Sequence, residues 1–94
     1  MLNNPDLVTL VSLGCVSGVK EKLSQGWNPN IQSGNGMSAI NKAVERNDLE
    51  MLEVLVAAGG RLDVRDGTYF TPLEIAEEYG NKEMVKFIKD HLHY

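Results

Sequence analysis

The sequence predicts an all-α fold, a solenoid of three helix-turn-helix repeats with projecting β-turn or hairpin loops. The first observation is that the chain aligns with itself at an offset of 33 residues, so that residues 36–43 fall on residues 69–76. The second is that the same offset places residues 47–55 on residues 80–88. Third, stretches rich in Gly, Asn and Asp separate the aligned blocks and favour turns over a further helix. A sustained period of this size indicates stacked repeats instead of an ordinary globular core.

Length and composition set the limits of the fold. The 94 residues have room for one domain over residues 1–94, with repeats at approximately 3–33, 34–66 and 67–94. The hydrophobic share of 43% and the charged share of 23% are ordinary for a globular protein, which argues against disorder and against a membrane partner. The net charge of −4 argues against a nucleic-acid partner, because such proteins neutralise phosphates.

The N-terminal apolar stretch has two interpretations. Residues 7–16 are largely apolar and contain Cys15, as a secretory segment with a lipoprotein-type cysteine would. However, no Lys or Arg precedes Lys20, and the apolar positions recur in the later repeats, so we favour a repeat helix. As the single cysteine, Cys15 cannot form an internal disulfide, which favours a reducing compartment and a cytoplasmic location.

The first helix of each repeat is predicted from its start signal. In residues 71–74 (Thr-Pro-Leu-Glu), the threonine caps the helix, the proline takes the first helical position, and the glutamate closes a capping box. Residues 38–41 repeat this more weakly, and Asn4 with Pro5 offers a similar start one residue out of phase. We expect these helices to end at residues that tolerate a left-handed backbone, namely Gly14, Asn47 and Gly80.

The second helices follow after short turns. Asp48 and Asn81 are expected to cap two of them, whereas Cys15 at the equivalent place cannot cap well. The first two of these helices should stop at Gly26 and at residues 59–60, and the third should run toward the chain end.

The first and last repeats each have polar residues at positions where the other repeats have apolar ones. The first repeat has Gly18, Glu21 and Lys22 where the others place apolar residues, and the last repeat has Lys82 and Lys89 at another pair of such positions. Because a terminal repeat lacks one neighbour, we expect these residues to cap a complete three-repeat unit.

These segments resemble the ankyrin repeat family over essentially the whole chain. The third repeat carries most of the matching residues: Thr71, Pro72, Leu73, Ala76, Gly80, Glu83, Val85, Lys86 and Ile88. Residues 26–30 and 14–23 match in the first repeat, and residues 38–56 match in the second. The resemblance implies a stacked scaffold that recognises another protein.

Departures from the family pattern also make predictions. At the position of the family's motif histidine, the three repeats have Val8, Asn41 and Glu74. The hydrogen bond that this histidine makes between repeats is therefore replaced or lost. The glycine before Thr-Pro is Tyr69 in the last repeat, where a positive φ would be costly, so we expect Gly67 to take over the turn.

The resemblance implies a concave binding surface on the loop tips and the exposed side of the first helices. Its expected protein-binding residues are Met37, Lys42, Glu45, Arg46, Phe70, Ile75, Glu78 and Tyr79. Exposed aromatic side chains beside charges are typical anchors of protein interfaces. The alternative is that Tyr69 and Phe70 fold back over the last loop, and we expect Trp27 to pack against a neighbouring loop.

Catalytic chemistry has little support, so we expect no catalytic, cofactor or metal site. His91 and His93 lie in the last few residues, without a local cysteine or histidine spacing that binds metal. The carboxylates Glu77, Glu78 and Glu83 suit a solvated helix face. Cys15 lacks a nearby base and is expected to be an ordinary surface or half-buried cysteine, although a helix start can lower a thiol pKa. Residues 34–36 (Gly-Asn-Gly) lack the Lys-Ser/Thr of a phosphate loop.

The expected function is therefore binding of another protein by a small monomer that is not an enzyme. An inhibitor or adaptor that occludes its partner is the simplest form. An immunity or antitoxin protein that neutralises a toxin is an alternative, and a small metal-dependent hydrolase is a remote one.

Overall fold

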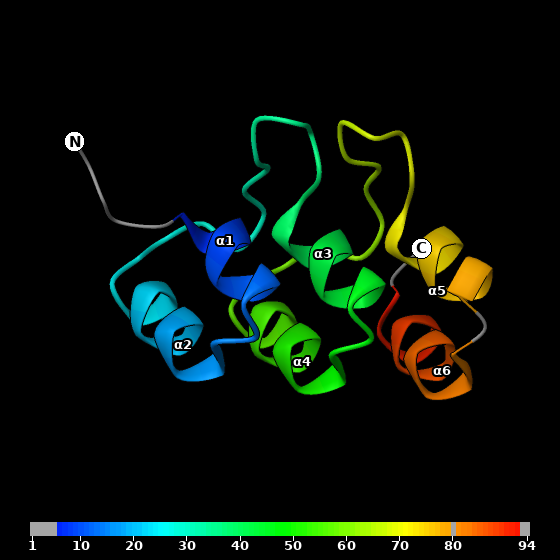
Figure 1. Cartoon of the computed structure of the whole chain (residues 1–94). Helices are drawn as coiled ribbons and strands as arrows, with labels where there is room; N and C mark the ends of the chain where they lie inside the picture. Colours follow the sequence, from blue (N-terminus) through cyan, green and yellow to red (C-terminus); the bar gives the residue numbers. More distant parts are fainter. Residues whose placement is uncertain (1–5, 80, 93–94) are drawn as a thin grey trace.

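The computed structural model describes residues 6–79 and 81–92, which form six helices (Figure 1). These are α1 (Leu7–Ser12), α2 (Val16–Ser24), α3 (Ala39–Glu45), α4 (Leu49–Ala57), α5 (Pro72–Tyr79) and α6 (Lys82–His91). The described residues contain no strand, only one isolated antiparallel bridge between Gln32 and Ser38. The predicted all-α solenoid of three helix pairs is confirmed.

The helices form two rows, with α1, α3 and α5 in one row and α2, α4 and α6 in the other (Figure 1). Within the first row, α3 packs against both α1 and α5, and each first helix packs against the second helix of its own repeat. Two long connections, the α2–α3 loop (residues 25–38) and the α4–α5 loop (residues 58–71), project side by side from the first row (Figure 1). The molecule is elongated, with extents of 39 × 24 × 23 Å.

Most of the predicted helix starts are confirmed. The Ser38, Asp48 and Asn81 side chains accept hydrogen bonds from backbone N–H groups three residues on. The capping box is complete, since Glu74 N donates to Thr71 Oγ1 at 3.2 Å and Thr71 N donates to Glu74 Oε1 at 3.0 Å. Cys15 precedes α2 and makes no side-chain cap, as expected.

The expected start of the first helix is wrong. Asp6 is the N-cap of α1, and its Oδ1 accepts a hydrogen bond from Thr9 N at 2.8 Å. Asn4 and Pro5, where we expected the cap and the first helical residue, lie outside the described residues. A carboxylate beside three free N–H groups is the better acceptor at a helix N-terminus.

The helix ends follow the expectation at the described positions. Gly14 and Asn47 have φ of 72° and 59°, and Gly26 and Gly59 after the second helices have φ of 92° and 103°. Gly80, the third expected end, lies outside the described residues.

The core runs along the molecule between the two rows. Leu7 and Val11 of α1 are fully buried in it, together with apolar residues of every other helix, so the repeat-helix interpretation of this stretch is confirmed. Glu21, Lys82 and Lys89 are exposed on the end repeats. Within residues 6–79 and 81–92, no helix has both the length and the apolar character needed to cross a membrane.

Candidate functional site

The α4–α5 loop is tied to the second repeat through the buried carboxylate of Asp66. Its Oδ2 accepts hydrogen bonds from Ser38 N at 2.8 Å and from Asn41 Nδ2 at 2.9 Å. Its Oδ1 accepts from Thr68 N at 2.8 Å and also from the Thr68 hydroxyl. One side chain therefore shapes its own loop and holds that loop against the start of α3.

These hydrogen bonds decide the ionisation of Asp66. Burial, the largest single influence, raises its pKa, but the hydrogen bonds from Thr68, Ser38 and Asn41 together outweigh burial and leave the pKa below 3.8. The carboxylate is thus charged at neutral pH although only 7% of the residue is exposed.

Asn41 replaces the hydrogen bond of the family's motif histidine. From a fully buried position, its Nδ2 donates to Asp66 Oδ2 and also to the Phe70 carbonyl oxygen, at 2.9 Å in each case. Its Oδ1 is buried and has no hydrogen-bond partner among residues 6–79 and 81–92. At the two equivalent positions, Val8 is buried in the core, and Glu74 serves the capping box and Arg65.

The turn before α5 corrects the prediction about Gly67. Tyr69 itself adopts a positive φ of 72°, so Gly67 does not take over the turn. Gly67 serves a different purpose, because its backbone lies against Gly36 of the neighbouring loop, with Gly67 N donating to Gly36 O at 2.8 Å. A Cβ on Gly67 would lie 2.6 Å from Gly36 Cα, which explains why a residue without a side chain stands there.

The aromatic residues of this region face solvent. Tyr69 is 80% exposed and Phe70 is 53% exposed, so the alternative in which they fold back over the loop is wrong. Tyr79 at the end of α5 is 55% exposed. Trp27, in contrast, is partly buried against the core, and Lys22 Nζ lies 5.0 Å from the centre of its ring.

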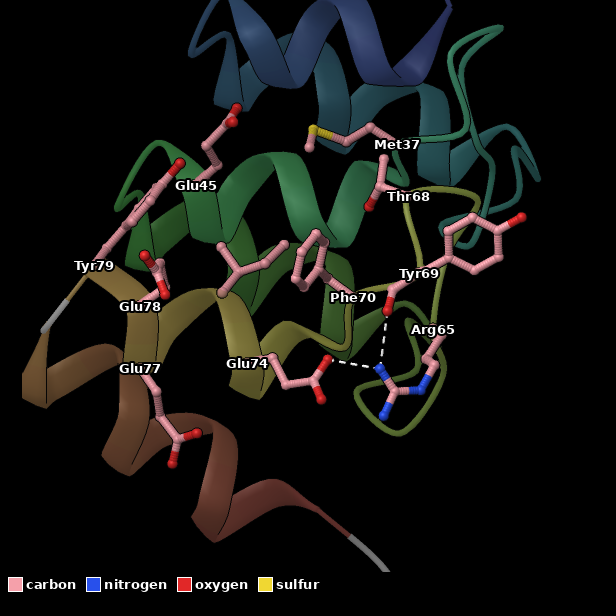
Figure 2. A pocket seen from close by; sticks show the side chains of 11 residues that line it. Met37, Glu45, Arg65, Thr68, Tyr69, Phe70, Glu74, Glu77, Glu78 and Tyr79 are labelled. Carbon is pink, nitrogen blue, oxygen red and sulfur yellow. Dashed lines mark hydrogen bonds and ion pairs between the residues drawn. The ribbon is translucent and has the colours of Figure 1, made fainter.

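An open hollow of about 880 Å³ lies over α5 and the α4–α5 loop, with Met37 and Glu45 of the second repeat at its other side, and we name it the third-repeat hollow (Figure 2). It is lined by Met37, Glu45, Arg65, Thr68, Tyr69, Phe70, Glu74, Ile75, Glu77, Glu78 and Tyr79. Six of the eight predicted binding residues line it: Met37, Glu45, Phe70, Ile75, Glu78 and Tyr79. The hollow combines apolar and aromatic surface with carboxylates.

One predicted residue differs from the exposed position that we expected, and two others lie outside the hollow. Ile75 is only 8% exposed, so it belongs to the core edge beneath the hollow and not to an exposed helix face. Lys42 and Arg46 do not line the hollow. Lys42 forms an ion pair with Glu45 at 2.7 Å, and the Arg46 guanidinium extends toward Gly14 of the first repeat.

Acidic groups outnumber basic ones around the hollow. The lining contains Glu45, Glu74, Glu77 and Glu78 against the single arginine Arg65. Arg65 Nη1 donates to Glu74 Oε1 at 2.7 Å and to the Tyr69 carbonyl oxygen at 2.8 Å, as the dashed lines in Figure 2 show. Hydrogen bonding from Thr71 N, and then from Arg65, lowers the pKa of the Glu74 carboxyl.

Sequence reasoning missed Arg65, Tyr69, Glu74 and Glu77 as lining residues. Tyr69 was available from the 33-residue offset, which places it on Gly36 in a loop tip. Arg65 is not part of any sequence motif, and its contact with Glu74 depends on how the α4–α5 loop folds back toward α5.

Among residues 6–79 and 81–92, no three His, Cys, Asp or Glu side chains gather in a way that could hold a metal ion. His91 is exposed, stacks on Phe87 with ring centres 4.1 Å apart, and has Nδ1 2.8 Å from the Phe87 carbonyl oxygen. His93 lies outside the described residues. Glu77, Glu78 and Glu83 are exposed, as expected, and Cys15 is a half-buried free thiol.

Comparison with known proteins gives one family match, over residues 7–93, to a model described as "Ankyrin repeats (3 copies)". An ankyrin repeat-containing protein of Schizosaccharomyces pombe is 32% identical over 79% of the chain and 36% of its own length. Bos taurus cyclin-dependent kinase 4 inhibitor B is 28% identical over 87% of the chain and 63% of its own length. Homo sapiens cyclin-dependent kinase inhibitor 2A is 28% identical over 87% of the chain and 53% of its own length. The chain thus spans about a third to two thirds of the length of these relatives.

Proposed function

Because the chain belongs to the ankyrin repeat family, we propose that it is a non-catalytic, cytoplasmic binding module that occludes a partner protein through the face containing the third-repeat hollow. Ankyrin repeats bind other proteins, and two relatives of the chain are named as cyclin-dependent kinase inhibitors. An inhibitor that blocks a docking surface is the simplest form of such a binder.

The single observation that carries the proposal is the exposure of Phe70 and Tyr79 beside carboxylates around one hollow. Large side chains that face water lower the free energy of a complex when a partner covers them, and a few such anchors dominate an interface. Both residues stand on ordered backbone, because Asn41 and Asp66 donate hydrogen bonds to the Phe70 carbonyl oxygen and Tyr79 belongs to α5. Little ordering is therefore needed on binding.

The test is a double variant, Phe70→Ala with Tyr79→Ala, compared with Leu13→Ala. Leu13 occupies the position of Tyr79 in the first repeat and is 70% exposed, but it does not line the hollow. The tagged chain is used to purify its partner from the native source, and the affinity of each variant for that partner is measured by calorimetry.

We expect the double variant to weaken binding by roughly 30-fold or more, the effect of a central anchor pair. The Leu13→Ala control should retain its affinity. A folded double variant that binds as tightly as the parent chain would place the interface elsewhere.

A further inference from the structure

We propose that the third-repeat hollow binds an arginine side chain, presented by a partner segment with an apolar residue next to it. The inference rests on the proposed function and names the chemistry of the partner. It follows from the different states of the two ends of the hollow, one of which is already filled by an arginine of this chain.

At the first end, Arg65 shows how the surface receives a guanidinium group. Its Nη1 lies between the Glu74 carboxylate and the Tyr69 carbonyl oxygen, at 2.7 and 2.8 Å. Both acceptors come from the hollow itself. The carboxylate at this end is therefore already paired with a cation and attracts a second one only weakly.

At the second end, Tyr79 lies with Glu45 and Glu78, and Phe70 stands at the centre of the hollow (Figure 2). Glu78 is exposed and forms no ion pair within residues 6–79 and 81–92. Glu45 shares its charge with Lys42 through one oxygen, Oε1. This end thus has aromatic surface and carboxylate oxygens, and no cation of the lining faces them.

Charge and shape together select arginine. A guanidinium is planar, stacks on aromatic faces and donates two parallel hydrogen bonds to a carboxylate, whereas an ammonium group is a strongly hydrated point charge. The arginine stem can cover the apolar surface of Phe70 and Ile75, while the guanidinium lies beside Tyr79 and Glu78. An acidic partner residue would be repelled by the same carboxylates.

The experiment uses the whole chain labelled with ¹⁵N and an acetylated, amidated Leu-Arg-Leu tripeptide as the probe. Matched tripeptides with Gln or Lys in the middle serve as controls. We expect saturable amide shifts for the arginine probe at Phe70, Ile75, Glu78 and Tyr79, with binding about tenfold weaker for the Gln probe.

Three variants locate the contact. Glu78→Gln and Tyr79→Leu should each weaken the arginine probe by about threefold, which is typical of one exposed charge or cation–π contact. Glu83→Gln removes the same charge from an exposed position on α6 outside the hollow and should change nothing. Both hollow residues are exposed, so these variants are expected to fold.

Several outcomes would overturn the arginine assignment: no saturable shift, equal binding of the Gln or Lys probe, or shifts centred outside the hollow. The proposed function is tested separately by the purified partner. If the partner no longer binds the Phe70→Ala, Tyr79→Ala double variant but binds Glu78→Gln with unchanged affinity, only the arginine inference is contradicted. A partner indifferent to both would contradict the proposed function itself.

Discussion

The α2–α3 and α4–α5 loops build the same turn from different residues. Ser33 N donates to Met37 O and Gly36 N donates to Ser33 O, and the identical pair of bonds recurs 33 residues later between Asp66, Phe70 and Tyr69. Within this turn, the residue with positive φ is Gly36 in the α2–α3 loop and Tyr69 in the α4–α5 loop. A backbone shape shared by the two loops therefore tolerates very different side chains.

The side chains give the two loops different roles. At the equivalent position, Asp66 bonds to the start of α3, whereas the Ser33 hydroxyl bonds only within its own loop, to Asn35. The α4–α5 loop also carries two exposed aromatic rings and a non-glycine residue in a left-handed conformation. Strain of this kind persists where the surroundings over-determine the backbone, and it often marks functional surfaces.

The largest expected effect comes from Asp66→Ala. The change leaves Ser38 N and Thr68 N without their acceptor and removes one of the two acceptors of Asn41 Nδ2, and it should lower the free energy of unfolding by about 3 kcal/mol. Ser33→Ala at the equivalent position should cost less than about 0.5 kcal/mol. Urea unfolding of both variants measures the difference, and equal losses would refute the asymmetry between the loops.

Gly67→Ala should come next. The new Cβ would meet backbone atoms of Gly36 at 2.6 Å and 3.0 Å, so the two loop tips must separate, at a cost of about 2 kcal/mol. Gly34, its equivalent in the α2–α3 loop, has nothing within 4 Å of the same position, and Gly34→Ala should be nearly neutral. Thermal unfolding of the two variants tests whether Gly67 lies this close to Gly36. Equal melting temperatures would show that it does not.

Lowering the pH should weaken the hydrogen bonds by which Asp66 holds the α4–α5 loop against the start of α3. The pKa of Asp66 in the folded chain lies below 3.8, so its stabilisation is complete above about that pH and is lost as the pH falls through the folded value. The difference in unfolding free energy between the parent chain and Asp66→Asn should shrink in that window. A constant difference down to acid pH would show that the charge of Asp66 is not involved.

The smallest expected effect belongs to Tyr69→Gly. Relieving the positive φ stabilises the fold, while the greater freedom of glycine in the unfolded chain offsets part of the gain, which leaves about 0.5 kcal/mol. Tyr69→Ala keeps the strain without the ring and should give no gain. Comparing the two variants by urea unfolding separates backbone strain from the loss of the ring, and equal stabilities would exclude strain.

Local signals account for what was predictable from the chain alone. The helix caps, left-handed helix ends and 33-residue period act within a few residues or within one repeat, and α4 (Leu49–Ala57) and α5 (Pro72–Tyr79) follow from them. The apolar positions that recur at this period form the core or pack against it, with Leu73 and Val85 only partly buried.

The candidate site was predicted in part, for a physical reason. Phe70, Glu78 and Tyr79, which the aligned positions predict as binding residues, line one hollow, because every repeat presents the same face. The alignment could not show that Ile75 is buried where Lys42 and Thr9 are more exposed, since the packing around α5 differs.

The repeat fold, its helices and its core could be predicted from the chain alone, because these depend on short-range caps and on a regular apolar period. The contacts of Asp66 with Ser38 and Asn41, which lie 28 and 25 residues earlier, and the positive φ of Tyr69 are visible only in the folded molecule. They depend on how the α4–α5 loop packs against α3, and that packing brings together side chains whose spacing along the chain does not indicate that they meet.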